Sequence, residues 1–416
     1  MGNNADGDRL IDCFLNLGEL MLRAGAEVNR VEDTIRRIGH AYDFERVEIF
    51  TINNMISLTV ISPDGRVYSQ TRRVSVAAVD LEKVARANEL SRQICANPVP
   101  QEELRAKITD IAQNTRHYGK RMHYIASVVS ATAFTVFFGG NWVEAMISGV
   151  VSIILVTCML FSDRLKIRPI IAILVSAFVM TVCVQGVTHF VGSANMDSII
   201  MGNIMLLIPG LALTTSIRDV ITGDTVAGLM GICDALLKAF AIAVGCVSAM
   251  LIIVYSEPVS SGGNAFYVQI IAAVFSAIGF SLLFNIHGRT LIITAVGAAI
   301  TWGAYLIVIT RTDNVFLACF IATMVIMAFA EIMARIAKTP VIILLVPMLI
   351  PMVPGGDLYN MMTNLVMDNS GQVRFYGHQL VMEVGAIAFG IIVISTAMQL
   401  ILKMHAHITE MRKAKH

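Results

Sequence analysis

Four charged residues lie inside long apolar stretches of this 416-residue sequence: Asp234, Lys238, Glu331 and Glu383. A charge in an apolar layer is costly, so each of them should face a partner or water. Asp234 and Lys238 are four residues apart and can pair on one helix face. Glu331 or Glu383 is expected to take up and release a proton, because desolvation favours the neutral acid.

A second chemical feature is an apolar run that breaks and turns polar, "LLIPGLALTTSIRD" at residues 206–219. Pro209, followed by Gly210, removes a backbone donor and frees carbonyl groups, which an apolar layer tolerates only inside protein or beside a wet cavity. The polar residues after the break are Thr214, Thr215, Ser216 and Asp219. The segment predicts the wall of a polar binding cavity; the alternative is a simple kink in a packed helix.

The pattern returns as "LLVPMLIPMVPGGD" at residues 344–357, where Pro209 aligns with Pro347 and Asp219 with Asp357. Two further matches are "SAxxF" at 130–134 and 276–280, and "AIAVG" at 241–245 with "AIAFG" at 386–390. The chain therefore contains an internal repeat. The candidate cavity residues in its second copy are Pro347, Pro351, Gly355 and Asp357.

The composition places these segments in lipid, since 56% of the residues are hydrophobic and only 15% are charged. Ten apolar segments follow Met122, most of them about 17 to 25 residues long, as a membrane-spanning helix requires. The matches relate spans one, four and five to spans six, nine and ten, so each repeat has five spans. An odd number of spans inverts the second copy. We therefore expect a polytopic α-helical membrane protein, with ten transmembrane helices in two inverted five-helix repeats.

The Lys and Arg residues predict that both termini are cytoplasmic. In that orientation the cytoplasmic connections carry seven Lys or Arg residues and the outer connections carry two. The first residues, "MGNNADGDRL", have neither a basic region nor an apolar core, so no cleaved signal peptide is expected.

Residues 1–120 are expected to form a small cytoplasmic α+β domain. Alternating segments "ERVEIFTI", "MISLTVIS" and "RVYSQTRRV" predict a three-stranded meander, with two helices before it, the first from about Arg9, and two after it. Asn29 followed by Glu32 fits a helix N-terminal cap. Glu27, Glu32 and Asp33 form either a carboxylate site or a solvated helix face, and the alternation of acids with bases favours the face.

Several classes of partner are not expected. The residues before Met122 contain 17 Lys or Arg and 17 Asp or Glu, so the basic excess of a nucleic-acid-binding domain is missing. The seven cysteines are scattered singly and the nine histidines include no H-E-x-x-H motif, so neither a metal nor another cofactor is expected. The expected partners are the lipid bilayer and a small molecule, and a homo-oligomer is compatible with the sequence.

Two motifs carry a likeness to a known family. "GAEVNRVEDTIRRI" at 25–38 and "LLIPGLALTTSIRDVITGD" at 206–224 resemble the bacterial threonine/serine exporter family, and the likeness runs over essentially the whole chain. It implies an inner-membrane exporter of small polar metabolites that uses an ion gradient, most simply the proton gradient. Some split members of that family resemble dicarboxylate (succinate) exporters, so the substrate stays open between these classes.

The expected organisation is a cytoplasmic domain at 1–120, a first membrane repeat at 121–260 and a second at 261–416. A membrane-anchored hydrolase is a competing interpretation, but ten spans exceed what an anchor needs, and nothing in the first domain resembles a nucleophile with its base. A passive channel is another competing interpretation. Unlike a transporter, a channel cannot drive flux against a gradient. The sequence therefore favours a transporter and not an enzyme.

Overall fold

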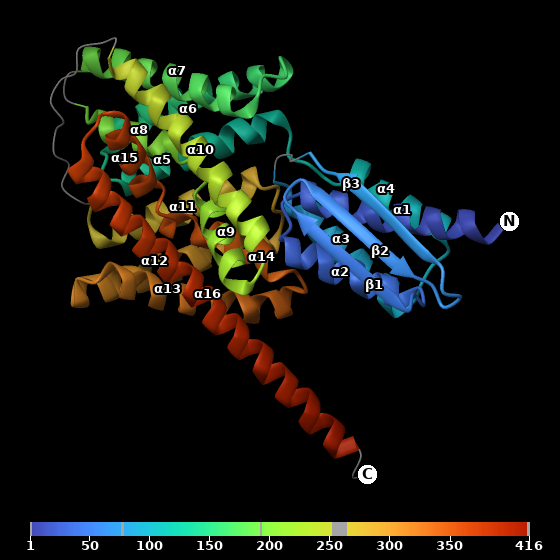
Figure 1. Cartoon of the computed structure of the whole chain (residues 1–416). Coiled ribbons are helices and arrows are strands. Elements are labelled where there is room, and N and C mark those ends of the chain that lie inside the picture. Colours follow the sequence, from blue (N-terminus) through green and yellow to red (C-terminus); the bar gives the residue numbers. More distant parts are fainter. Residues whose placement is uncertain (1, 76–78, 192–193, 252–263, 414–416) are drawn as a thin grey trace. The chain divides into compact units, whose positions relative to one another are not determined.

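The computed structural model describes residues 2–75, 79–191, 194–251 and 264–413 (Figure 1). The chain divides into two compact units. Unit 1 comprises Met1–Tyr118 with Phe284–His287, and unit 2 comprises Gly119–Leu283 with Gly288–His416. The predicted boundary between the two membrane repeats, at residues 260 and 261, lies outside the described residues.

The sheet of unit 1 is an antiparallel meander. Its strands β1 (Arg46–Ile52), β2 (Met55–Ile61) and β3 (Val67–Arg73) are ordered β1-β2-β3, so the predicted meander is confirmed. Side chains alternate between the two faces of a strand, which puts the apolar residues of β2 on one face. Those fully buried residues are Ile56, Leu58 and Val60.

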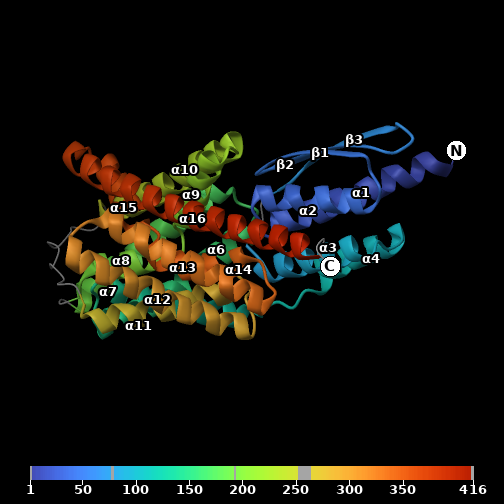
Figure 2. The same ribbon diagram turned by 90° about the horizontal axis from the view of Figure 1, so that it is seen from below.

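The helices of unit 1 lie in two layers on one face of the sheet (Figure 2). The nearer layer is α1 (Gly2–Arg23) and α2 (Val28–Ala41), which contact the strands. The farther layer is α3 (Leu81–Ala96) and α4 (Gln101–Asn114). The core of the unit therefore lies between the sheet and the helices.

Two expectations about the first helices are wrong in detail. Helix α1 begins at Gly2, not near Arg9. Helix α2 begins at Val28 after Glu27, without a side-chain cap, so Asn29 lies inside the helix and does not cap it. The Glu32 carboxylate instead accepts a hydrogen bond from the backbone N–H of Thr51 at 2.8 Å. That bond ties α2 to the end of β1.

Unit 1 also contains a segment from much later in the chain, Phe284–His287. The Asn285 side chain donates to Asp80 Oδ1 at 3.0 Å and to the Arg116 carbonyl at 2.9 Å. The ring of His287 stacks on Tyr118, with 4.1 Å between ring centroids. These bonds integrate the late segment into the fold of unit 1.

The membrane unit, unit 2, is built from helices. In its first half the described helices are α5 (Lys120–Phe137), α6 (Trp142–Arg164), α7 (Pro169–Val191), α8 (Met196–Ile204), α9 (Gly210–Thr222) and α10 (Thr225–Met250). In its second half they are α11 (Phe266–Leu283), α12 (Arg289–Thr312), α13 (Val315–Ala337), α14 (Val341–Leu349), the 3-10 helix η1 (Ile350–Met352), α15 (Gly355–Val366) and α16 (Ser370–Lys413). The C-terminal part of α16 extends beyond the other helices of this unit (Figure 1).

Among the described residues, seven helices are long and apolar enough to cross a membrane, namely α6, α7, α10, α11, α12, α13 and α16. An eighth span is possible if α14 with η1 and α15, which meet at a 53° bend, count as one. This supports a polytopic membrane protein, but the expected count of ten is not confirmed. Helix α5 is as long as α11, at 18 residues, but is less apolar and starts with Lys120 and Arg121, while α8 and α9 are each short.

Helices α5 and α11, which carry the two "SAxxF" copies, pack closely against each other. A Cβ at Gly279 would lie 2.9 Å from the Ala126 carbonyl oxygen, so only glycine permits this approach. The matching phenylalanines of the two motifs, Phe134 and Phe280, contact each other edge to face with centroids 6.0 Å apart. The two copies of the sequence motif thus meet at one contact.

The helix starts correct the alignment of the two broken segments. Helices α14, α15 and α16 each begin 145 residues after α8, α9 and α10, at Val341, Gly355 and Ser370 against Met196, Gly210 and Thr225. Pro209 and Pro354 precede α9 and α15 and are therefore equivalent. The pairing of Pro209 with Pro347 is wrong, because Pro347 lies inside α14.

Candidate functional site

A cavity of about 310 Å³ lies inside unit 2, beside the break between η1 and α15. The broken segment supplies Pro351 to Pro354, followed by Gly356, Asp357 and Asn360 of α15. Glu383 of α16 and Cys319 of α13 complete the polar side of the lining. The remaining lining residues are apolar or aromatic and come from α5 and the residue after it, from α8 and from α12: Phe134, Phe137, Phe138, Met201, Trp302 and Tyr305.

Proline creates the break that opens this site. Pro351 lies at the start of η1 and Pro354 caps α15 without a side-chain hydrogen bond. Neither residue has a backbone N–H, so the regular helical ladder cannot continue through them. The chain bends by 53° there, and α15 starts with its first turn at the cavity. This break places Asp357 in that first turn, where the helix dipole favours a negative group.

The central chemical feature is a pair of carboxyl groups, Asp357 and Glu383. Both side chains line the cavity and interact electrostatically, and α15 packs against α16. A hydrogen bond between two carboxyl groups needs one proton on the pair, since an ionised carboxylate can only accept. Both groups also lie within electrostatic range of Tyr305. The pair can therefore hold a proton, or exchange it for another cation.

Aromatic rings form another part of the lining. Trp302 stacks on Tyr305 with centroids 4.5 Å apart and planes 18° apart, both residues being on α12. The ring centroids of Phe137 and Trp302 are 4.5 Å apart, and those of Phe137 and Phe138 are 5.4 Å apart. Trp302, Tyr305 and the phenylalanines therefore form a continuous wall, with no gap between the α5 and α12 contributions.

The structure brings together three of the residues expected to bind the small molecule or carry the proton: Pro351, Asp357 and Glu383 line the cavity. Gly355 lies next to it, where a Cβ would come within 2.8 Å of the Met205 side chain. Pro347 is buried inside α14, one helix segment before the break. The second broken segment therefore supplies part of the site, and its glycine allows close packing.

The first broken segment contributes differently. Gly210 lies against the wall, because a Cβ there would overlap the Val353 side chain. The Thr214 hydroxyl donates to the Gly210 carbonyl at 3.1 Å, and Thr215 donates to a carbonyl of the same helix. Asp219 pairs with Arg218 at 3.0 Å. Pro209, Thr214, Thr215, Ser216 and Asp219 are not among the described residues that line the cavity.

The other intramembrane charges form ion pairs. Lys238 Nζ lies 2.6 Å from Asp234 Oδ2, the pair that their spacing allows. Glu331 Oε2 accepts from Arg335 Nη1 at 2.8 Å, a partner one turn along α13. Within the described chain, none of these residues lines the cavity. Of the four intramembrane charges singled out from the sequence, Glu383 is the one found at the site.

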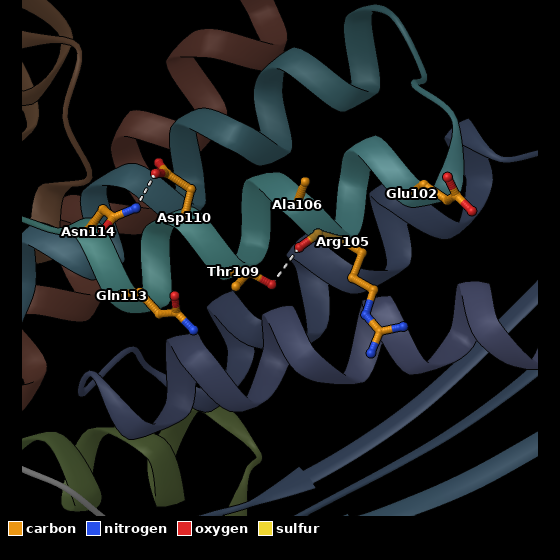
Figure 3. Close-up of a pocket in the computed structure, with 7 residues that line it drawn as sticks. All are labelled: Glu102, Arg105, Ala106, Thr109, Asp110, Gln113 and Asn114. Carbon is orange, nitrogen blue, oxygen red and sulfur yellow. Dashed lines mark hydrogen bonds between the residues drawn. The ribbon is translucent and has the colours of Figure 1, made fainter.

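A second hollow lies on unit 1, along one exposed face of α4 (Figure 3). All its described lining residues come from that single helix, which makes it a surface depression. Asp110 accepts hydrogen bonds from Asn114 and Arg86, and these bonds lower the pKa of the Asp110 carboxyl. On α2, Asp33 pairs with Arg37 at 2.9 Å, which fits a solvated helix face more than a carboxylate site.

Sequence reasoning missed the aromatic wall. Phe134 belongs to a repeated motif and Trp302 is one of only two tryptophans, but neither signal indicates a cavity. In the described part of the chain, no group of three or more His, Cys, Asp or Glu side chains has the arrangement of a metal site. The cavity is therefore described by its carboxyl pair, its aromatic wall and the broken helix.

Long apolar helices around a cavity with a carboxyl pair beside a broken helix define the class: a polytopic α-helical membrane transporter. Residues 12–253 match the family described as "Putative threonine/serine exporter", and residues 269–397 match the one described as "Threonine/Serine exporter". The chain belongs to the threonine/serine exporter family, a family of transporters and not of enzymes.

Three curated relatives are similar at low identity. A "Threonine/serine exporter" from Corynebacterium glutamicum is 22% identical over 82% of this chain and 73% of its own length. A "Probable threonine/serine exporter" from Mycobacterium tuberculosis is 20% identical over 57% of this chain, which spans 45% of that relative. The "Probable succinate transporter subunit YjjP" from Escherichia coli is 23% identical over 57% of this chain and 92% of its own length. No solved structure matches the chain.

Proposed function

We propose that this protein exports L-threonine and L-serine across the bacterial inner membrane, driven by protons that move inward. The observation that carries the proposal is the cavity at the broken helix, which both Asp357 and Glu383 line. Two relatives whose names include threonine and serine support the substrate. The proposal places the substrate in this cavity.

The charges of the cavity favour an amine over a dicarboxylate. Among the described lining residues none is Lys, Arg or His, while two are acids. An ammonium group would be attracted to the carboxyl pair, whereas a succinate dianion would meet like charges without a cationic side chain to balance them. The name of the Escherichia coli relative keeps succinate as the second candidate.

The carboxyl pair also supplies a mechanism for coupling. When the pair holds one proton, the protonated acid can donate a hydrogen bond to the other carboxylate, and both line the cavity. When a substrate ammonium enters, it can hydrogen-bond both carboxylates, and the shared proton becomes dispensable. Because two interacting acids titrate as a unit, binding of the cation and release of the proton are linked. Alternation between these two occupants gives exchange of substrate for a proton.

We further infer that the membrane unit consists of two inverted five-span halves with both termini in the cytoplasm. The equal spacing of helix starts supports the repeat, if α8 with α9 and α14 with α15 each count as one broken span. The contact of the equivalent residues Phe134 and Phe280 is expected beside a two-fold axis. Transporters with inverted repeats place their substrates at such broken helices. The distribution of Lys and Arg supports the orientation.

The test is efflux from liposomes that contain the purified protein and are loaded in turn with labelled threonine, serine and succinate. Each efflux is measured with and without an imposed pH gradient, and protein-free liposomes serve as the control. Stimulation of threonine or serine movement by the gradient is the expected result. Movement of succinate alone would assign the chain to the dicarboxylate class, and movement of none of the three would overturn the proposed function.

A further inference from the structure

The aromatic wall of the cavity is held by a chain of polar contacts outside it. The Trp302 indole N–H donates to Gln269 Oε1 at 3.3 Å, and the Gln269 amide donates to the Asn264 carbonyl at 2.8 Å. The Asn264 amide in turn donates to the Val136 carbonyl at 2.6 Å, at the end of α5. Because Gln269 occupies the indole N–H, Trp302 offers its π-system and not a hydrogen-bond donor to an occupant.

Every strong electrostatic feature of the cavity attracts a cation. Asp357 and Glu383 carry the acidic groups, and tryptophan and tyrosine rings attract ammonium groups through the faces that do not stack on each other. Tyr305 lies within electrostatic range of both acids, so rings and carboxyls act on the same volume. A substrate ammonium therefore has attractive partners in both the acids and the rings of the lining.

A substrate carboxylate has far less to bind. The described lining contains no cationic side chain, and the side-chain amide in it is that of Asn360. The partial positive charge of the first turn of α15 is already opposed by Asp357 in that turn. When a zwitterionic substrate binds, the charge of the two acids in the cavity is left unbalanced. A substrate with a net positive charge balances it better. The recognition energy must therefore come from the amine end of the substrate.

We propose that the cavity recognises a small primary ammonium compound through the acid pair and the Trp302–Tyr305 wall, and that the α-carboxylate is dispensable. The transporter then moves small hydroxylated amines, such as 2-amino alcohols, in addition to the amino acids. This inference rests on the proposed function, since it concerns the same cavity and the same exchange with protons.

Two analogues of threonine separate the amine from the carboxylate. Threoninol keeps the ammonium and hydroxyl groups but lacks the carboxylate, whereas 2,3-dihydroxybutyrate keeps the carboxylate and lacks the ammonium. Labelled threoninol should be transported by the reconstituted protein and should compete with threonine at concentrations within about tenfold of threonine itself, and 2,3-dihydroxybutyrate should not compete. Competition by the hydroxy acid alone, with threonine transport intact, would overturn the inference and leave the proposed function standing.

The tryptophans provide a matched pair of variants. Trp302→Leu should raise the KM for threonine and for threoninol by about 5- to 30-fold, since the cation–π contact is lost, while Trp302→Phe should retain most of it. Trp142, which is 71% exposed on α6, lies outside the described cavity lining, and Trp142→Leu should leave both KM values unchanged. Equal KM values for Trp302→Leu and the wild type, in protein of unchanged thermal stability, would show that the wall is packing only. Absence of threonine transport by the wild type would instead refute the proposed function.

Discussion

Glu383→Gln tests the role of the carboxyl pair with the smallest change in shape. Glutamine keeps the volume of the side chain and can still hydrogen-bond Asp357, but it carries neither a negative charge nor an exchangeable acid proton. Because Glu383 lines the cavity on α16, the substitution acts at the site itself. Substrate should still enter, but the pair can no longer trade its proton for an ammonium group.

The size of the effect follows from the bond that is removed. A hydrogen bond to a charged group contributes about 1.5 to 3 kcal/mol, and each 1.4 kcal/mol corresponds to a factor of ten in affinity. The KM for threonine should therefore rise by about 10- to 100-fold. Accumulation driven by a pH gradient should be lost, because the remaining acid cannot share a proton with a second acid.

Two assays on the same liposomes separate these effects. Exchange of internal against external labelled threonine without a gradient reports substrate binding, and uphill accumulation under a pH gradient reports coupling. The Glu383→Gln protein should exchange at saturating threonine but should not accumulate it. Both activities should be measured at equal protein content.

Glu331→Gln is the matched control. Glu331 is also an intramembrane glutamate, but it pairs with Arg335 and is not among the described residues of the cavity. Its substitution should leave the coupling unchanged. Full gradient-driven accumulation by the Glu383→Gln protein, or its loss in both variants, would refute the assignment of coupling to the pair.

Three further predictions concern packing and stability. Gly210→Val should reduce threonine transport at least tenfold, since a Cβ at this position overlaps Val353 of the cavity wall. The control is Gly186→Ala, which should transport like the wild type because a Cβ at Gly186 would meet open space. Glu144→Ala should destabilise the membrane unit by about 1 to 3 kcal/mol, because the buried carboxylate accepts backbone and side-chain hydrogen bonds from loop residues. Thermal unfolding in detergent measures this loss of stability. A Tm equal to that of the wild type would contradict the prediction. In unit 1, hydrogen bonds lower the pKa of Asp110, so its stabilisation is present above the usual value of about 3.9 and is lost as the pH falls further. Asp110→Asn should therefore weaken the acid dependence of the melting of unit 1, and an unchanged pH profile would argue against it.

The parts of the structure that follow local rules were predictable. Strict alternation of apolar and polar residues gave the meander of unit 1, since the period of a strand leaves few other solutions. The charge of Glu383 inside an apolar run and the proline break before Asp357 also marked these residues, because a charge or a broken helix in lipid needs a structural reason. Physical cost marked Glu383, whereas Asp357 was marked by its place at the end of the repeated proline segment.

The aromatic wall could not be predicted in the same way. Phe137 and Trp302 contact each other, but they lie far apart in the sequence and on different helices. Aromatic residues are ordinary in membrane helices, so only the folded structure shows that these rings share a cavity. Conversely, Thr214 and Thr215 looked available to a ligand, but their hydroxyls bond to carbonyl groups of their own helix.

The alignment of the broken segments shows how local similarity can mislead. Matching proline to proline placed Pro209 on Pro347, yet the fold uses these residues differently. Pro209 and Pro354 precede helices, whereas Pro347 is accommodated inside one. In the corrected register Asp357 corresponds to Ala212, so the acid pair belongs to the second half alone. That asymmetry is visible only once the helix boundaries are known.

The central claim is that threonine and protons move in opposite directions through the Asp357–Glu383 cavity. It is tested most directly with a pH-sensitive dye inside liposomes that are loaded with threonine and contain the purified protein, with no pH gradient imposed. As threonine leaves down its own gradient, the interior should become acidic, and the Glu383→Gln protein should release threonine without this change. Threonine efflux from wild-type liposomes at constant internal pH would contradict the account.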